Sequence, residues 1–408
     1  MNCRFDGKKI TNQFVDLGFS PPSNSFLTKA QLNEGEVFYP LKLYVSERTF
    51  LVQTDEYKQA SEIFSEDYVY FSSFSTSWLE HSKAYVEMMI SRFDFTPSSF
   101  VVEIASNDGY LLQYFKERNI PVLGIEPTAG TAATAEKKGI PSWVNFFGVE
   151  LAERMVKEGK QADLLLGNNV LAHVPDINDF IKGLKIALKH VGIITMEFPH
   201  LMKLIENNQF DTIYHEHFSY LSLHAVNIIF KHHGLTIFDV EEIPTHGGSL
   251  RIFAKHHDNN LNPIGPSVET LLKKEVAAGM TSLPYYEGFQ EKVNDIKNAF
   301  LEFLLKAKKE KKRIAAYGAA AKGNTLLNYC GIKTDLIDFV VDANPHKQNK
   351  YLPGSHIPVV SEATLKIERP DYVIIFPWNI KEEIKDQLAY IREWDGQFVT
   401  AIPNLQIF

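Results

Sequence analysis

The sequence has few cysteines and no long apolar run. Only two cysteines, Cys3 and Cys330, occur among its 408 residues, so we expect no disulfide framework and a reducing compartment. No apolar run approaches the ~18–20 residues that a membrane-spanning helix needs. The first residues are polar and lack the pattern of a signal peptide. These absences predict a cytoplasmic protein that does not enter a membrane.

The sequence also lacks an excess of positive charge and a glycine-rich phosphate motif. Its formal net charge is -8, so no broad basic surface is available to hold nucleic acid. The basic run at 306–313 is typical of the solvated end of a helix. No GxGxxG motif occurs, which removes the usual fingerprint of a dinucleotide site. A chain of this length is expected to form two or three domains.

What the sequence does contain is most informative at residues 101–126. A short apolar run at 101–105 ends in a loop at 106–109, and after a helix-like stretch a second apolar run ends at Glu126. An acid about 20 residues after such a loop is suited to the two hydroxyls of a ribose. The loop carries Asp108 in place of a phosphate cradle. It therefore favours a nucleoside ligand with a positive charge and no phosphate, such as S-adenosylmethionine (SAM).

Turn residues and apolar periodicity divide the chain into three parts. Residues 1–66 show short apolar alternations and predict a small β-rich module. Residues 67–258 alternate strand-like and helix-like segments, which predicts a mainly parallel sheet with helices on both faces. Residues 259–408 open with a proline- and glycine-rich connector at 259–284, followed by a strongly amphipathic helix. The layout of strand, glycine loop, helix, strand and acid then recurs, so the predicted fold class is α/β with a second Rossmann-like domain.

Residues 214–217 bring several titratable groups together. They read Tyr214, His215, Glu216 and His217. In an extended strand the two histidines share one face, whereas in a loop all four side chains can converge. A histidine is a natural general base at neutral pH, and a tyrosine hydroxyl can donate to a developing enolate oxygen. The alternative is a structural histidine packed beside a tyrosine, but the density of titratable groups favours a function.

Further candidates follow the ends of other predicted strands, where ligands bind in parallel sheets. His173 is either a ligand group or a loop histidine that caps the next helix. Arg251 pairs either with an anionic substrate or with a surface acid. The histidines are numerous enough for a metal site, but their spacing matches no HExxH pair and we expect no catalytic metal. The remaining candidates at this rim are Asn168, Asn169, Glu197 and His246.

A glycine loop at 318–324 opens a predicted helix in the C-terminal part. Its backbone N–H groups, together with Lys322, are suited to a pyrophosphate. Asn324 ends the loop. The alternative is an ordinary glycine turn, since the loop by itself is a weak signal.

Taken together, these segments resemble the SAM-dependent sugar C-methyltransferases of deoxysugar biosynthesis, which methylate nucleotide-linked 4-keto sugars at C-3. The resemblance spans nearly the whole chain. It implies a small zinc-type N-terminal module (1–66), a SAM-binding methyltransferase domain (67–258) and a Rossmann-like C-terminal domain (259–408). It rests on LGFSPPSNSF near the start, YVYFSSFSTSWLEH at 68–81, EIASNDGYLL at 103–112, GNNVLAHVPD, YHEHFSYLS, HGGSLR at 246–251 and AAYGAAAKGNTLLNYCGI at 315–332.

The resemblance implies roles for individual residues. Tyr214, Glu216 and His217 match the family's catalytic segment, and His173 matches a second active-site histidine. The implied cofactor-binding residues, with Glu126 as the ribose acid, are Tyr70, Phe71, Ser73, Glu103, Ala105, Asn107, Asp108, Glu126, Asn168 and Asn169. The expected substrate-binding residues are Glu197, His246, Arg251, Lys322 and Asn324.

The chain departs from the family pattern in two places. The zinc module of the family uses two CxxC pairs, but here the first pair reads Cys3 and Asp6 and the second reads Ser46 and Thr49. One thiolate cannot build a four-cysteine site, so we expect no structural zinc. Ala105 stands where the family usually has glycine, which adds one methyl group and need not exclude SAM.

The expected function is methyl transfer from SAM to a carbon of a nucleotide-linked 4-keto deoxysugar, by a monomer or weak homodimer. In this hypothesis His217 removes the C-3 proton, Tyr214 or His173 stabilises the enolate oxygen, and Glu216 orients its neighbours. Three alternatives stay open on the sequence: a sugar O- or N-methyltransferase, an NAD-dependent nucleotide-sugar oxidoreductase, and a non-catalytic nucleotide-sugar binder.

Overall fold

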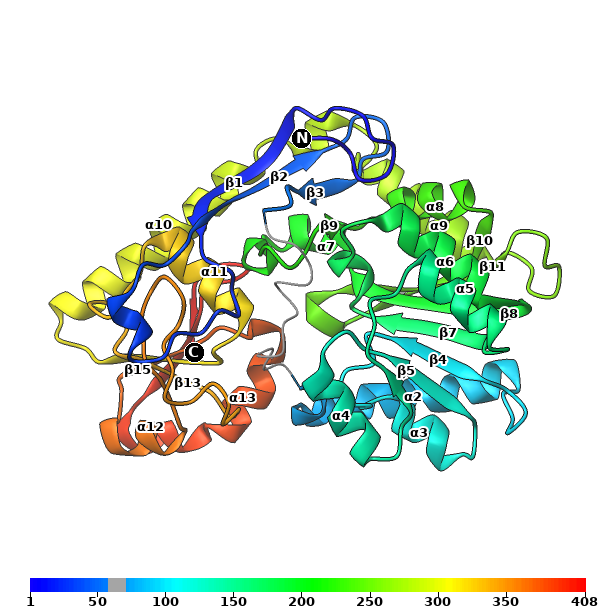
Figure 1. Cartoon of the computed structure of the whole chain (residues 1–408). Coiled ribbons are helices and arrows are strands. Elements are labelled where there is room, and N and C mark those ends of the chain that lie inside the picture. Colours follow the sequence, from blue (N-terminus) through cyan, green and yellow to red (C-terminus); the bar gives the residue numbers. More distant parts are fainter. Residues whose placement is uncertain (58–70) are drawn as a thin grey trace.

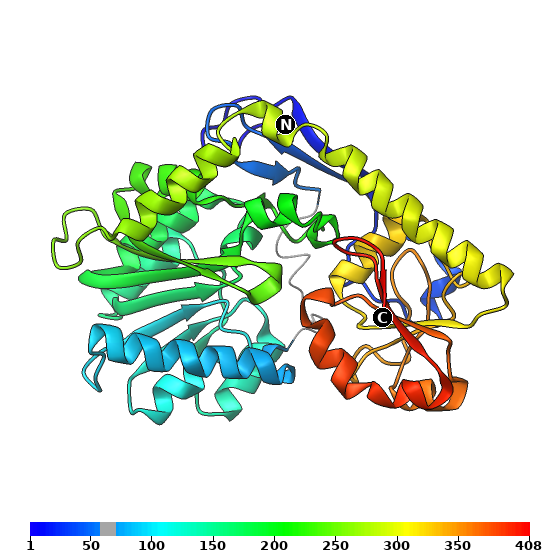
Figure 2. The ribbon, with the colours of Figure 1, turned by 180° about the vertical axis from the view of Figure 1, so that it is seen from behind.

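The computed structural model describes residues 1–57 and 71–408, and within them the chain forms three sheets of four, seven and six strands (Figure 1). The two larger sheets belong to two α/β domains that lie side by side, and the N-terminal module spans their upper ends in both views (Figures 1 and 2). This layout confirms the predicted fold class of an α/β chain with a small β-rich N-terminal module.

The N-terminal module is a sheet in the order β1-β2-β3-β9, in which every neighbouring pair is antiparallel. Its own strands are β1 (Asn12–Ser20), β2 (Tyr39–Val45) and β3 (Val52–Thr54). The fourth strand, β9 (Ser219–Tyr220), comes from the segment that follows residues 214–217. The module and the predicted catalytic segment are therefore joined by strand pairing.

An ion pair joins the two loops at which the family would place zinc ligands. Arg48 Nε lies 3.2 Å from Asp6 Oδ2, and burial raises the pKa of the neighbouring Cys3 thiol. In the described ranges no group of three His, Cys, Asp or Glu residues lies close enough to hold a metal ion. The absence of zinc stays a prediction, and the loops are closed by protein contacts.

The central domain contains a seven-stranded sheet in the order β10-β11-β8-β7-β4-β5-β6, with only β11 antiparallel to its neighbours. Its strands are β4 (Val101–Ile104), β5 (Val122–Ile125), β6 (Ser142–Trp143), β7 (Ala162–Asn168), β8 (Leu188–Pro199), β10 (Leu235–Ile243) and β11 (Ser249–His256). Neighbouring residues of β7 face opposite cores: Leu165 packs on the side of α5, α6 and α8, whereas Leu164 packs on the side of α2 and α3.

The helices of this domain cover both faces of the sheet, as predicted (Figure 1). They are α2 (Thr76–Phe93), α3 (Leu112–Glu117), α4 (Ala129–Lys137), α5 (Val149–Lys157), α6 (Ile177–Ala187) and α8 (Leu223–His232). The short helix α7 (Leu201–Glu206) packs instead in the core that the N-terminal module shares with the C-terminal domain. The chain runs from β4 to β5 on one side and from β7 to β8 on the other, so the strand order reverses between β4 and β7. Such a switch point leaves a crevice at the carboxyl ends of the strands, where ligands bind.

The predicted connector at 259–284 is wrong over half of its length, because it contains the helix α9 (Pro266–Ala278). Pro266 occupies the first turn, where a helix needs no backbone N–H donor, and Gly279 ends the helix in a left-handed conformation. These residues mark the ends of a helix. The predicted amphipathic helix is α10 (Phe289–Lys309), which packs along the C-terminal domain (Figure 2).

The C-terminal sheet has the order β14-β13-β12-β15-β16-β17, and all strands but β17 are parallel. Its elements are β12 (Ile314–Tyr317), α11 (Ala321–Cys330), β13 (Phe339–Val341), β14 (Val359–Val360), α12 (Ala363–Glu368), β15 (Tyr372–Ile375), α13 (Lys381–Gln387), β16 (Gln397–Thr400) and β17 (Gln406–Ile407). The order of its parallel strands matches β6-β5-β4-β7-β8 of the central sheet, which confirms a second Rossmann-like domain.

The C-terminal glycine loop is shorter than predicted. Helix α11 begins at Ala321, so Lys322 and Asn324 lie in its first turn. No helix in the part of the chain that the structure describes is both long enough and apolar enough to cross a membrane.

Gly109 is predicted to be essential to the loop after β4. Its φ is +75°, and an added Cβ would lie 2.4 Å from Ile140 Cδ1. We expect Gly109→Ala to cost about 2 kcal/mol through strain and overpacking, and to lower the midpoint of thermal unfolding by about 4–8 °C. Gly130→Ala is the control, because a Cβ on Gly130 meets nothing within 4 Å. A Gly109→Ala protein that melts at or above the wild-type temperature contradicts this prediction.

Candidate active site

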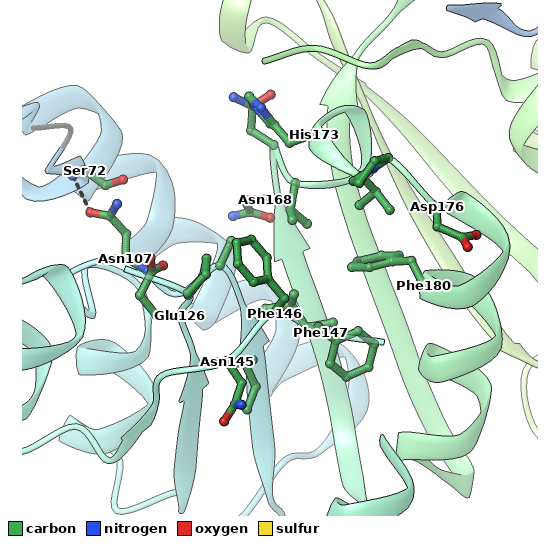
Figure 3. A pocket seen from close by; sticks show the side chains of 18 of the residues that line it. Ser72, Asn107, Glu126, Asn145, Phe146, Phe147, Asn168, His173, Asp176 and Phe180 are labelled. Atoms are coloured by element: carbon green, nitrogen blue, oxygen red, sulfur yellow. Dashed lines mark hydrogen bonds between the residues drawn. The ribbon is translucent and has the colours of Figure 1, made fainter. Parts of the chain in front are cut away.

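A cavity of about 510 Å³ lies at the carboxyl ends of β4, β5 and β7, which is the size of a typical small-molecule site (Figure 3). It lies at the switch point of the central sheet, as predicted for the ligand rim. Among the predicted site residues, those that line it are Ala105, Asn107, Glu126, Asn168, Asn169, His173 and His246. Its apolar wall includes Trp78, Phe146, Phe147 and Phe180.

The loop after β4 brings its backbone to the cavity through left-handed residues. Ala105 has φ 56°, Asn107 has φ 50° and Gly109 has φ 75°. A left-handed conformation at position 105 is the physical reason why glycine suits this position, since an L side chain is strained there. The alanine of this chain adopts it nonetheless, and lines the cavity.

Glu126 ends β5 and is held in place by the backbone of two loops. Its carboxylate accepts hydrogen bonds from the N–H groups of Asn107 and Thr128, both at 2.9 Å. Burial raises its pKa, which these two hydrogen bonds oppose. Figure 3 shows Glu126 beside Asn107 at the base of the cavity, where a carboxylate can meet the hydroxyls of a ribose.

Other predicted cofactor residues lie outside the cavity lining. The Asp108 carboxylate accepts a hydrogen bond from Ser73 Oγ and pairs with Lys138 Nζ at 3.1 Å, so it ties the loop to neighbouring segments. Glu103 is fully buried, and burial raises its pKa well above the usual range. Phe71 stacks on His346 of the C-terminal domain at 5.7 Å between ring centroids. Tyr70 lies outside the described residues.

The donor set and charge of the cavity fit SAM. Asn168 Nδ2 and Asn169 Oδ1 are buried and have no hydrogen-bond partner in the described part of the chain, so both are available to a polar ligand. The described lining contains the acids Glu56, Glu126, Asp176 and Asp179 and no lysine or arginine. Such a lining favours a cationic ligand without a phosphate, as the loop sequence predicted.

Residues 214–217 form a turn, so the extended alternative is wrong. The His217 N–H donates to the Tyr214 carbonyl at 3.0 Å, and the two rings lie 4.1 Å apart. The His217 ring also meets the ring of His173 edge to face at 4.5 Å. Because His173 lines the cavity, it connects the cofactor cavity to His217.

His217 has the geometry of a general base. Its Nδ1 lies 3.1 Å from the Thr212 carbonyl, which can only accept, so Nδ1 carries the proton and Nε2 carries the lone pair. The buried Nε2 has no hydrogen-bond partner among the described residues. Burial, followed by the charge of His173, lowers the pKa of His217 well below its usual range. The imidazole is therefore neutral and ready to accept a proton.

The other two residues of the turn face the N-terminal module, so the four side chains do not converge. His215 Nε2 lies 3.1 Å from the Pro40 carbonyl. Both oxygens of Glu216 accept hydrogen bonds from Asn24 Nδ2, at 2.9 and 2.8 Å. Glu216 thus holds the loop of the N-terminal module against the turn.

Lys322 adds positive charge near His217 and His246. The His246 ring lies 5.2 Å from the ring of Trp78, and burial lowers its pKa to about 4. Lys322 Nζ donates to Asn379 Oδ1 at 2.7 Å. The Lys322 side chain is partly exposed, but the surrounding protein removes much of its water. This desolvation lowers its pKa to about 8. Asn324 donates to the Ser23 carbonyl of the N-terminal module.

Glu197 and Arg251 are paired with each other beneath the cavity. Arg251 Nη2 lies 3.1 Å from Glu197 Oε2, while Nη1 lies 3.0 Å from Glu241. Burial acts to raise the pKa of Glu197, but His81 and Arg251 outweigh it and the net shift is downward. The structure therefore places Arg251 in a buried network instead of at a surface acid, and its role in substrate binding stays a prediction.

Two residues of the site were not singled out from the sequence, the aromatic Trp78 and the acidic Asp211. Trp78 lines the cavity and stacks on His81 at 5.0 Å. Their spacing of three residues on a helix was the available signal, since such residues share a face. Asp211 accepts a hydrogen bond from Trp378 Nε1 of the C-terminal domain at 2.7 Å. No spacing in the sequence links these two residues.

Comparisons with known proteins agree with this organisation. Residues 3–64 match a family described as a putative zinc binding domain, residues 80–240 a methyltransferase domain, and residues 244–403 a C-methyltransferase C-terminal domain. The C-methyltransferase NovU of Streptomyces niveus is 31% identical over 405 residues, which cover 99% of this chain and 96% of NovU.

Two solved structures that the chain resembles each match less than half of it. The PH0226 protein of Pyrococcus horikoshii is 14% identical and covers 49% of this chain and 99% of its own, with a TM-score of 0.39. Magnesium protoporphyrin IX methyltransferase of Synechocystis, with bound SAM, is 14% identical over 43% of this chain and 78% of its own, with a TM-score of 0.34. No conclusion rests on these two similarities.

Glu126 is predicted to carry much of the affinity for SAM. Glu126→Ala removes a buried carboxylate and leaves two backbone donors without their acceptor, so we expect the dissociation constant to rise at least about tenfold. Isothermal titration calorimetry measures this change. Asp108→Asn is the matched control in the same loop, because Asp108 lies outside the cavity lining. A larger loss in the control than in Glu126→Ala assigns the ligand acid to Asp108 instead.

Proposed function

The chain belongs to the C-methyltransferase family, it uses SAM, and we propose that its methyl acceptor is C-3 of a nucleotide-linked 4-keto deoxysugar. The observation that carries the proposal is the continuity from the cofactor cavity to a base. Glu126 and Asn107 lie at one end of the cavity, His173 lies at the other, and the free Nε2 of His217 follows directly behind His173.

The charge of the region beyond the cavity supports an anionic acceptor. Lys322 supplies positive charge on this side, and this charge lowers the pKa of both His217 and His246. The first backbone N–H groups of α11 precede its first hydrogen bond, which runs from the Asn324 N–H to the Ala320 carbonyl. A helix N-terminus beside a lysine is suited to the diphosphate of a nucleotide sugar.

The chemistry follows from the state of the two histidines and the tyrosine. When bound, SAM supplies a methyl group on a positively charged sulfur, which a carbon nucleophile can displace. His217 Nε2 takes the proton from C-3, whose acidity comes from the neighbouring ketone at C-4. The electron pair of the C–H bond moves toward the ketone oxygen. Tyr214, 4.1 Å from His217 ring to ring, or His173 then donates to this oxygen as its negative charge develops.

Carbon is favoured over the other acceptors that the sequence left open. The match of residues 244–403 to a C-methyltransferase C-terminal domain sets the O- and N-methyl alternatives aside. The acidic cavity without lysine or arginine, as far as the chain is described, does not favour the pyrophosphate of NAD. A neutral, desolvated base also suits carbon deprotonation, because a buried imidazole keeps its lone pair at neutral pH.

Mass spectrometry of nucleotide-linked 4-keto sugars incubated with SAM tests the proposal. We expect at least one sugar to gain a single methyl group, and the enzyme to exchange its C-3 hydrogen with solvent deuterium when SAM is left out. Exchange without SAM separates carbon deprotonation from methyl transfer. If no sugar of the panel gains a methyl group or exchanges its C-3 hydrogen, the proposed acceptor is wrong.

His217→Ala is predicted to abolish both deuterium exchange and methylation, a loss of at least about a hundredfold for a general base. SAM affinity should stay close to that of the wild type, because His217 lies outside the cavity lining. His215→Ala is the matched control: His215 is two residues away but faces Pro40, so it should keep the exchange rate. Near-normal exchange in His217→Ala assigns the base to another residue.

We expect the pH dependence of kcat/KM to reflect the lowered pKa values of His217 and Lys322. His217 has a lowered pKa, so its neutral form persists below pH ~6.5 and kcat/KM should not fall with the midpoint of an ordinary histidine. Lys322 has a pKa lowered to about 8, so its charge is present below that pH and is lost above it. We therefore expect kcat/KM for the sugar to decline above pH about 8. Lys322→Gln should remove this basic limb, and an unchanged limb in the variant means that another group titrates there.

A further inference from the structure

The base His217 receives its orientation from a single backbone carbonyl, that of Thr212. Thr212 belongs to the short 3-10 helix Phe210–Thr212, which links α7 to the catalytic turn. Its hydroxyl donates back to the Gln209 carbonyl at 2.7 Å. The direction of Nε2 therefore depends on what fixes this short helix.

Residues on both sides of Thr212 are bound to the C-terminal domain. On one side, Asp211 Oδ2 accepts the indole N–H of Trp378 at 2.7 Å. On the other, the Ile213 carbonyl accepts the hydroxyl of Thr325, from α11, at 2.7 Å. Asp211 and Thr325 are both 1% exposed, so water does not compete for these two bonds.

Trp378 is also pressed against the second histidine loop. A Cβ added to Gly247 would lie 2.3 Å from the Trp378 ring, so the indole rests directly on backbone next to His246. Gln209 Nε2 donates to the Gly247 carbonyl at 2.8 Å, which ties this loop to the start of the short helix. The ring of Trp378 also lies under Lys322 Nζ, 4.4 Å from the centroid.

We propose that Trp378 and Thr325 are positioning residues that hold the Thr212 carbonyl, and through it the tautomer and direction of His217. This role rests on the proposed function of His217 as the base. The C-terminal domain thus forms part of the deprotonation machinery although neither residue contacts the reacting carbon. Without these two hydrogen bonds the described contacts of the short helix with the C-terminal domain are packing and the attraction between Asp211 and Lys322. Nδ1 of His217 then loses a fixed acceptor.

The test compares Trp378→Phe and Thr325→Val with the wild type. Each change removes one donor and keeps most of the side-chain volume. We expect each to lower kcat and the rate of C-3 hydrogen exchange at least about tenfold, because a base displaced by about 1 Å loses rate steeply. The KM for the sugar and the dissociation constant of SAM should change less than about twofold, as expected when only transition-state interactions are lost.

Two controls separate positioning from folding. Trp394→Phe removes an indole donor of the same domain, whose acceptor is the Pro370 carbonyl at 3.0 Å, and should leave exchange unchanged. The double variant Trp378→Phe/Thr325→Val should lose less than the product of the single losses, because both act through one carbonyl. NMR of labelled histidine should show the Nδ1-protonated form of His217 in the wild type and a mixture of tautomers in the two single variants.

The outcomes distinguish this proposal from the proposed function. If the wild type exchanges the C-3 hydrogen and both single variants exchange it at the same rate, the positioning role is wrong. The base assignment then stays intact. A raised KM for the sugar with unchanged kcat in Trp378→Phe assigns Trp378 to substrate binding through Lys322 and also overturns it. A wild-type enzyme that exchanges hydrogen in no sugar of the panel instead removes the proposed function on which the inference rests.

Discussion

Under the proposed function, the hydrogen bond between His217 Nδ1 and the Thr212 carbonyl is the interaction on which the chemistry of this site depends. An imidazole in water exchanges its proton between two nitrogens and titrates near neutral pH. Burial removes the water, and the carbonyl accepts a hydrogen bond from one nitrogen only. The remaining nitrogen is left unpaired and neutral, which is costly for folding but useful for a base.

The charges on the two sides of His173 are of opposite kinds. The cofactor cavity has acids in its described lining, which suits a cationic methyl donor. The side of Lys322 and α11 carries positive charge and backbone N–H donors, which suits an anionic acceptor under the proposed function. Under the proposed function, the acidic side of His173 disfavours the anionic acceptor, and the positively charged side disfavours the cationic methyl donor.

The N-terminal module contributes to the site although its loops lack the usual cysteines. It pairs β3 with β9 directly after the turn at 214–217, and its Asn24 binds Glu216 of the turn. Asn324 of α11 donates to the Ser23 carbonyl of the same loop. The turn at 214–217 is consequently held by the N-terminal module on one side and by the C-terminal domain on the other. Three parts of the chain that are far apart in sequence define one imidazole position.

The sequence by itself indicated the strands at 101–105 and 122–125, the tight loop between them and the acid that ends the second strand, because these follow from local periodicity and short spacing. It also indicated a cationic nucleoside ligand, since Asp108 excludes a phosphate cradle. It failed at Pro266 and Gly279, because proline and glycine occur both in connectors and at the ends of helices. Here they mark the two ends of α9.

Only the tertiary structure decided which groups of the turn lie beside His173 and which face the N-terminal module. Tyr214 and His217 lie on one side and His215 and Glu216 on the other, because a tight turn replaces the alternation of a strand. The bond between Asp211 and Trp378 joins residues that are 167 positions apart. Such a contact depends on how two separately folded sheets dock, and no local pattern in the sequence encodes that docking.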